Sequence, residues 1–129
     1  MKNPTEKQIG GTHYINCAMQ PLELITTVRC SFIQGNIIKY ATRYRNKNKG
    51  KDLLKVIHYA QLAMYYNDRR FCKKEVLSQA VNRYVTKNKL SLIQRKIILA
   101  ALYNNYDRVE EYTRVLMDME GYANANDYL

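Results

Sequence analysis

Tryptophan is absent from this chain, and its 129 residues include only two prolines, five glycines and three cysteines. Cys17, Cys30 and Cys72 form no close pair and lack zinc-ligand spacing, which favours free thiols over a disulfide or a zinc site. No apolar run approaches the roughly 18 residues that a membrane span needs, and the N-terminus has no apolar secretory segment. We therefore expect a soluble cytoplasmic protein with no membrane partner.

The signatures of several enzyme classes are also missing. There is no G-x-x-x-x-G-K-[ST] stretch, which excludes ordinary phosphate-loop kinase chemistry. No set of Glu and Asp faces another in the way an all-α nucleotide pyrophosphohydrolase needs, and no Ser-His-Asp or Cys-His arrangement is evident. The sequence therefore assigns neither catalytic residues nor a metal-ligand set.

Positive charge is what the chain has in excess, because 21 Lys and Arg stand against 11 Asp and Glu, for a net charge of +10. Such an excess in a small protein indicates a polyanionic partner, with solubility alone as the simpler explanation. Residues 39–55 hold seven of the cations and one acidic residue. This basic stretch also carries apolar residues at helical spacing, so it borders a packed surface.

Hydrophobic periodicity predicts an all-α fold, because no segment alternates with period two over a convincing length. We expect a small bundle of about six helices behind an N-terminal arm that contains glycines. The first helix begins at Pro21, with Leu22, Ile25, Val28 and Phe32 along one face. The next three helices are expected at about 37–45, 51–68 and 73–86. A capping box of Ser91 and Gln94 predicts a fifth helix that begins at Leu92. Asp107 and Glu110 repeat this capping pattern for a sixth helix, which is expected to stop at Gly121.

Two regions are expected along the chain, and no strong internal repeat is evident. Residues 1–70 hold the arm and the basic stretch, and residues 71–129 form a C-terminal helical region. The second region is either part of the same compact unit or an appended oligomerisation module.

The first candidate binding group lies in the basic stretch, at Asn36, Lys39, Tyr40 and Arg43. Spacings of three, four and seven residues place these side chains on one helical face. Two cations, an amide and a phenol on one face suit a nucleotide phosphate, since Arg grips two phosphate oxygens at once. The simpler reading is an exposed polar face.

Two further groups extend this candidate site. Gly10, Gly11, His13 and Tyr14 form a segment in which paired glycines let backbone N–H groups approach an anion, unless the segment is only an arm. On the third expected helix, Asp52 and Lys55 form a charged pair. Asp52 alternatively serves as the N-cap of that helix.

These segments, taken in order, resemble a family of small bacteriophage proteins that includes a nucleotide kinase and proteins linked to sensitivity toward abortive infection. The family pattern has a His-Tyr pair, a Gly-Asn-x-x-Lys-Tyr-x-x-Arg segment and an Asp-Leu-x-Lys segment. The resemblance covers residues 10 to about 65, with matches at His13, Tyr14, Gly35, Asn36, Lys39, Tyr40, Arg43, Asp52, Leu53 and Lys55.

The resemblance implies that the matched residues bind a small nucleotide or nucleoside phosphate, in the host cytoplasm if the chain is phage-encoded. If the chain is an enzyme, it implies a nucleoside monophosphate kinase without a phosphate loop, which would use magnesium. One alternative is a non-catalytic protein that sequesters a nucleotide immune signal. A third hypothesis is nucleic-acid binding by Lys47, Lys49 and Lys51. Helical subunits this small seldom enclose a nucleotide alone, so we also expect a homo-oligomer.

Overall fold

A computed structural model describes residues 3–6, 8–9 and 17–122 of the chain. This described part contains no strand, so the predicted all-α fold is confirmed. The predicted arm with Gly10 and Gly11 lies outside the described residues. The helices are η1 (Pro4–Glu6), α1 (Pro21–Val28), α2 (Phe32–Arg43), η2 (Tyr44–Asn46), α3 (Gly50–Tyr65), α4 (Lys74–Lys87), α5 (Leu92–Leu102) and α6 (Tyr106–Met119).

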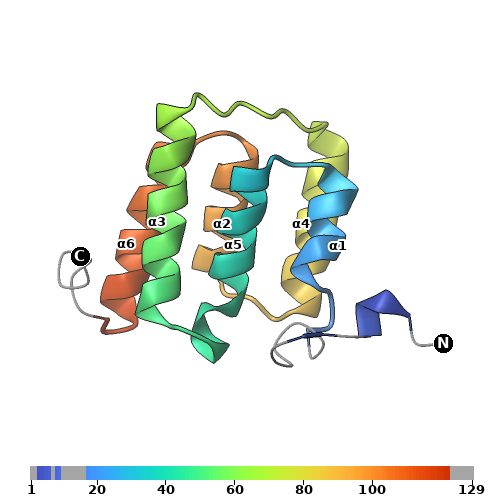
Figure 1. Ribbon diagram of the computed structural model, residues 1–129, viewed down its shortest axis with the longest axis horizontal. Coiled ribbons are helices and arrows are strands. Elements are labelled where there is room, and N and C mark those ends of the chain that lie inside the picture. Colours follow the sequence, from blue (N-terminus) through green and yellow to red (C-terminus); the bar gives the residue numbers. More distant parts are fainter. Residues whose placement is uncertain (1–2, 7, 10–16, 123–129) are drawn as a thin grey trace.

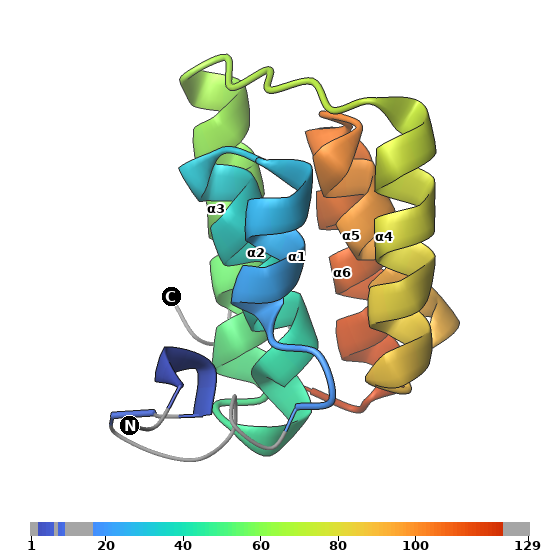
Figure 2. The ribbon, with the colours of Figure 1, turned by 90° about the vertical axis from the view of Figure 1, so that its right-hand side faces the viewer.

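The six α-helices of the described chain form two layers of three. Figures 1 and 2 show α1, α2 and α3 side by side in one layer, with α4, α5 and α6 in the other. Helices pair across the layers, α1 with α4, α2 with α5 and α3 with α6. The linker of residues 66–73 joins the layers at one end of the bundle. Both predicted regions therefore contribute to one packed body.

The core lies between the layers and draws on every α-helix. Leu24 of α1, Ile37 and Ile38 of α2, and Leu53 of α3 are fully buried. The facing layer contributes the fully buried Leu77, Val81, Tyr84, Ile97, Ile98, Ala101 and Val109. Each helix buries only one stripe, so neither layer alone would shield its apolar face from water.

Several predicted helix ends are confirmed. α5 begins at Leu92, and the Ser91 and Gln94 side chains form the expected capping box. α6 is followed by Gly121, whose φ of 72° lies in the left-handed region that glycine adopts without strain. The Gly121 N–H donates to the Asp118 carbonyl and the Tyr122 N–H to the Met117 carbonyl, so these two carbonyls near the helix end are satisfied.

Two predicted boundaries are wrong. The sequence predicts Leu22 and Phe32 along one face of the first helix, but α1 ends at Val28, Phe32 begins α2, and both side chains are exposed. Arg29 takes a left-handed φ of 53°, which stops α1, and α2 then starts behind a capping box of Ser31 and Gln34. At α6 the cap is Asn105 instead of Asp107, because the Asn105 side chain accepts from the Arg108 N–H.

The structure also reveals an internal repeat that the sequence analysis missed. α2 follows Ser31-Phe-Ile-Gln34 and α5 follows Ser91-Leu-Ile-Gln94, and each helix then continues with an Ile-Ile pair. Gln34 Nε2 donates to the Ala101 carbonyl of α5 at 3.0 Å, while Gln94 Nε2 donates to the Ala41 carbonyl of α2 at 2.8 Å. These reciprocal bonds relate the two layers by an approximate two-fold axis.

No helix in the described part of the chain is long and apolar enough to cross a membrane.

Candidate functional site

A buried ion pair joins α2 to the start of α3. Arg43 Nε lies 3.1 Å from Asp52 Oδ2, and a second Arg43 nitrogen donates to Oδ1 at 3.2 Å. The Asp52 side chain is fully buried and that of Arg43 is 11% exposed. The Asn48 backbone N–H also donates to Asp52, at 3.3 Å. A two-pronged Arg–carboxylate contact of this kind fixes the relative position of the two helices.

Above this pair, cations surround the Tyr40 ring. Arg43 Cζ, Lys55 Nζ and Lys39 Nζ lie 4.6, 4.8 and 5.2 Å from the ring centroid. Each distance is short enough for attraction between a cation and an aromatic ring, worth about 0.5–1 kcal/mol at an exposed site. We call Lys39, Tyr40, Arg43, Asp52 and Lys55 the Tyr40 cluster. Three cations and one carboxylate leave it two positive charges in excess.

The electrostatics of the cluster favour a bound anion. Burial, the Arg43 guanidinium and the Lys55 ammonium together lower the pKa of Lys39, and Asp52 only partly opposes them. Like charges held this close repel one another, and an anion placed between them relieves that repulsion. Lys55 is 44% exposed, so this side of the cluster is open to solvent.

Five of the ten predicted site residues come together in the Tyr40 cluster. Asn36 instead donates to the Phe32 carbonyl one turn earlier in its own helix, at 2.9 Å. The other four, Gly10, Gly11, His13 and Tyr14, lie outside the described residues, so their placement at this site stays a prediction.

Asp52 is not the N-cap of α3, but it forms the predicted charged pair with Lys55, whose Nζ lies 3.7 Å from Asp52 Oδ1. The helix N-cap position belongs to Lys49, and Asp52 is the third residue of α3. Its carboxylate nevertheless accepts from Asn48, just outside the helix, as an acidic residue in a first turn commonly does. Because both of its oxygens also accept from Arg43, Asp52 acts as an anchor for the cations.

Tyr59 is the residue of this region that the sequence analysis missed. Its ring stacks on Tyr40, with centroids 6.0 Å apart and planes 15° apart. Tyr59 follows Lys55 by four residues and Asp52 by seven, so helical spacing alone could have placed it on this face. The Tyr40 ring is thus held by Tyr59 and the cations, which makes it a platform for positive charge.

The described residues contain no group of three or more His, Cys, Asp or Glu that could hold a metal ion. Asp52 is the one carboxylate in the basic stretch of residues 39–55. Its hydrogen bonds from Arg43 and Asn48 suit a structural role better than a ligand role.

Comparison with known proteins gives one match. Residues 7–61 match the model of DUF3310, a family described as a protein of unknown function. The match contains the predicted glycine arm, α1, α2 and most of α3, and therefore the whole Tyr40 cluster. No curated protein and no solved structure matches the chain. The resemblance to phage nucleotide kinases stays a prediction.

Proposed function

We propose that this protein binds a small nucleotide or nucleoside phosphate at the Tyr40 cluster, in the cytoplasm of a phage-infected host. The observation that carries the proposal is the surplus of positive charge on a rigid base. A buried Arg43–Asp52 pair holds α2 against α3, and two further ammonium groups stand beside the ring above it. Preorganised cations bind phosphate without first being gathered from solution.

The phosphate is the part of the ligand that these residues suit. Arg43 and Tyr59 already contact the Tyr40 ring, so the proposed binding mode does not include stacking of a base on this ring. Lys39 and Lys55 are the groups that would meet phosphate oxygens with charge-assisted hydrogen bonds, and Lys55 Nζ also lies 3.7 Å from Asp52 Oδ1. Base recognition is assigned to the predicted arm, where His13 and Tyr14 lie outside the described residues.

Sequestration fits the cluster better than turnover does. Phosphoryl transfer uses a carboxylate to hold magnesium, and the carboxylate of this cluster is buried under its cations. The alternative is a nucleoside monophosphate kinase without a phosphate loop, which would bring its metal with the substrate. Incubation with a nucleoside monophosphate, ATP and magnesium separates these functions. A new diphosphate establishes an enzyme, whereas retention of unchanged ligand establishes sequestration.

Binding is tested by equilibrium dialysis against a panel of nucleoside mono- and diphosphates, after mass spectrometry of small molecules that copurify. Lys39→Gln/Lys55→Gln should weaken binding at least tenfold, since one charge-assisted bond is worth about 1.5–3 kcal/mol. The control Lys73→Gln/Lys74→Gln removes the same charge from exposed positions at the start of α4. Equal loss in the two variants would refute this site, and so would the absence of binding by the unaltered protein.

Self-association is part of the proposal, with the cluster near a subunit boundary. Sedimentation equilibrium with and without ligand tests it, and a monomer under both conditions would contradict it.

A further inference from the structure

The approximate two-fold axis relates two ends of the bundle that differ in the residues lining them. At the first end, the linker of residues 66–73 lies over Gln34. Gln34 Nε2 donates to the Arg70 carbonyl at 3.3 Å, and Arg70 Nε donates to the Arg29 carbonyl at 3.0 Å. Cys72 Sγ also reaches the Val28 carbonyl, at 3.0 Å. A cleft of about 660 Å³ remains beside this connection between α1 and α2, and its lining includes Asp68 and Tyr66.

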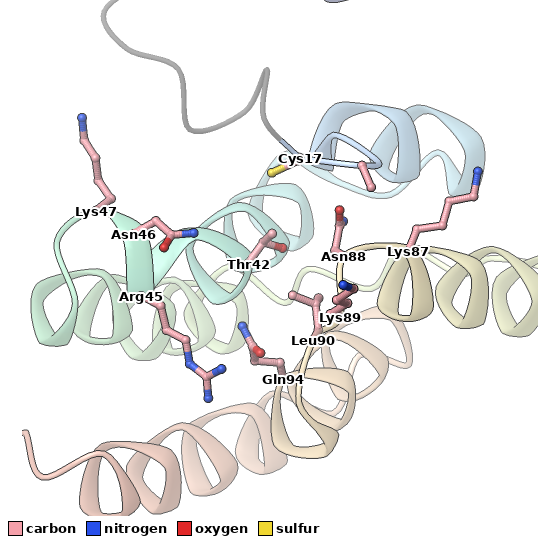
Figure 3. A pocket seen from close by; sticks show the side chains of 11 residues that line it. Cys17, Thr42, Arg45, Asn46, Lys47, Lys87, Asn88, Lys89, Leu90 and Gln94 are labelled. Carbon is pink, nitrogen blue, oxygen red and sulfur yellow. The ribbon is translucent and has the colours of Figure 1, made fainter.

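At the second end, Gln94 occupies the place of Gln34 and lines an open cleft. In the described part of the chain, Gln94 makes no bond to a linker comparable to that between Gln34 and Arg70. The cleft has a volume of about 680 Å³, within the range of small-molecule sites. It lies between η2 and the connection from α4 to α5, and Figure 3 shows Lys47 and Lys87 at opposite rims with Lys89 and Gln94 between them.

The cleft, which we call the basic cleft, is lined by four cations. They are Arg45, Lys47, Lys87 and Lys89, and no Asp or Glu is among the described residues that line it. Arg45 forms an ion pair at 2.8 Å with Glu120, a residue that does not line the cleft. The three lysines take part in none of the ion pairs found between described residues. Their charges are therefore available to a ligand.

The chemistry of the lining identifies the kind of ligand. No aromatic side chain is among the described lining residues, so the basic cleft offers no platform on which a base could stack. Its neutral groups are the amides of Asn46, Asn88 and Gln94 and the Thr42 hydroxyl, and Leu90 is its largest aliphatic side chain. We propose that the basic cleft is a second anion site that binds a linear chain of phosphoryl groups. None of its lining residues belongs to the Tyr40 cluster.

Isothermal titration with inorganic tripolyphosphate tests the proposal on the full chain. Lys47→Gln/Lys87→Gln/Lys89→Gln should weaken binding at least tenfold. The control Lys73→Gln/Lys74→Gln/Arg83→Gln removes three charges from exposed positions away from the basic cleft, and should change affinity by less than twofold. Equal weakening by both variants would overturn the site in favour of diffuse attraction to a basic protein. Absence of binding by the unaltered protein would also overturn it.

Further arms distinguish the source of the phosphates and separate this site from the first. A nucleoside triphosphate that competes with tripolyphosphate, and loses affinity in the same variant, would identify a nucleotide tail as the natural chain. An oligothymidylate that binds far more tightly than tripolyphosphate, and depends on the same lysines, would overturn the assignment and favour nucleic acid. Lys39→Gln/Lys55→Gln should leave tripolyphosphate binding at the basic cleft unchanged. The proposed site at the Tyr40 cluster and the one in the basic cleft can therefore be refuted independently.

Discussion

The layers α1–α3 and α4–α6 share a packing scheme but not a chemistry. Adding 60 to a residue number in α2 gives its counterpart in α5, so Ser31 and Gln34 correspond to Ser91 and Gln94. The same shift replaces Lys39, Tyr40 and Arg43 by Leu99, Ala100 and Tyr103. The buried Gln34, Ile37, Ile38 and Ala41 recur as Gln94, Ile97, Ile98 and Ala101, whereas the cations at positions 39 and 43 have no charged counterpart in α5.

This difference separates what the fold needs from what the first layer adds. The caps, the Ile-Ile pairs and the reciprocal glutamines occur in both layers, because both must pack against each other. The DUF3310 match ends within α3, and so lies within the first layer and the segment before it. The part of the chain that matches a family is thus the part that carries the Tyr40 cluster.

The largest expected effect concerns the counterparts Arg43 and Tyr103. Arg43→Ala should destabilise the fold by about 3–5 kcal/mol, because it leaves the buried Asp52 carboxylate without its main partner. Tyr103→Ala changes a side chain at a partly exposed position, and should cost about 1 kcal/mol or less. Urea unfolding of both variants measures the difference.

A double variant checks the physical cause. Asp52→Asn removes the charge that Arg43 compensates, so Arg43→Ala/Asp52→Asn should recover part of the lost stability. If the double variant is no more stable than Arg43→Ala, the cost comes from lost packing and not from an uncompensated charge.

A smaller effect tests the reciprocal glutamines. Gln34→Ala should cost about 3 kcal/mol and Gln94→Ala about 2 kcal/mol, since each removes a buried side-chain amide and its hydrogen bond to a carbonyl of the facing layer. Gln34 should cost more because it also donates to Arg70 and Asn104. Thermal and urea unfolding provide the measurement. A larger loss at Gln94 would contradict the expectation that the additional bonds of Gln34 to Arg70 and Asn104 stabilise the fold.

The smallest effects lie at the left-handed residues. Lys89→Gly and Arg29→Gly relieve backbone strain at equivalent positions of the two layers, and each should raise stability by about 0.5 kcal/mol. Gly121→Ala should lower the stability by about 1 kcal/mol. The cost comes from the left-handed φ of 72° alone, because an added Cβ would meet nothing within 4 Å. A gain from Gly121→Ala would show that this helix end adopts another conformation in solution.

The sequence alone predicted the features that depend on local spacing. The all-α fold, the start of α5 at Leu92, the stop at Gly121 and the shared face of Lys39, Tyr40 and Arg43 all follow from periodicity, capping and turn chemistry within one helix. The Arg43–Asp52 pair joins two helices whose relative placement is set by packing, so no spacing rule could indicate it.

Long-range features escaped prediction for related reasons. The repeat was missed because it rests on a short Ser-x-Ile-Gln pattern followed by common aliphatic residues, and only the bonds from Gln34 to Ala101 and from Gln94 to Ala41 make it visible. The lining of the basic cleft comes from stretches near residues 17, 42–47 and 87–94. Segments so far apart in sequence become neighbours only once the layers have packed.

The two-layer arrangement has a consequence for how the protein responds to dilution. A sheet of three helices with one apolar face is commonly completed by a second copy, and such an assembly falls apart as its concentration decreases. Here the second layer belongs to the same chain and is joined to the first by residues 66–73, so it is present at any protein concentration. The scaffold that holds the Tyr40 cluster should therefore persist at the lowest expression levels.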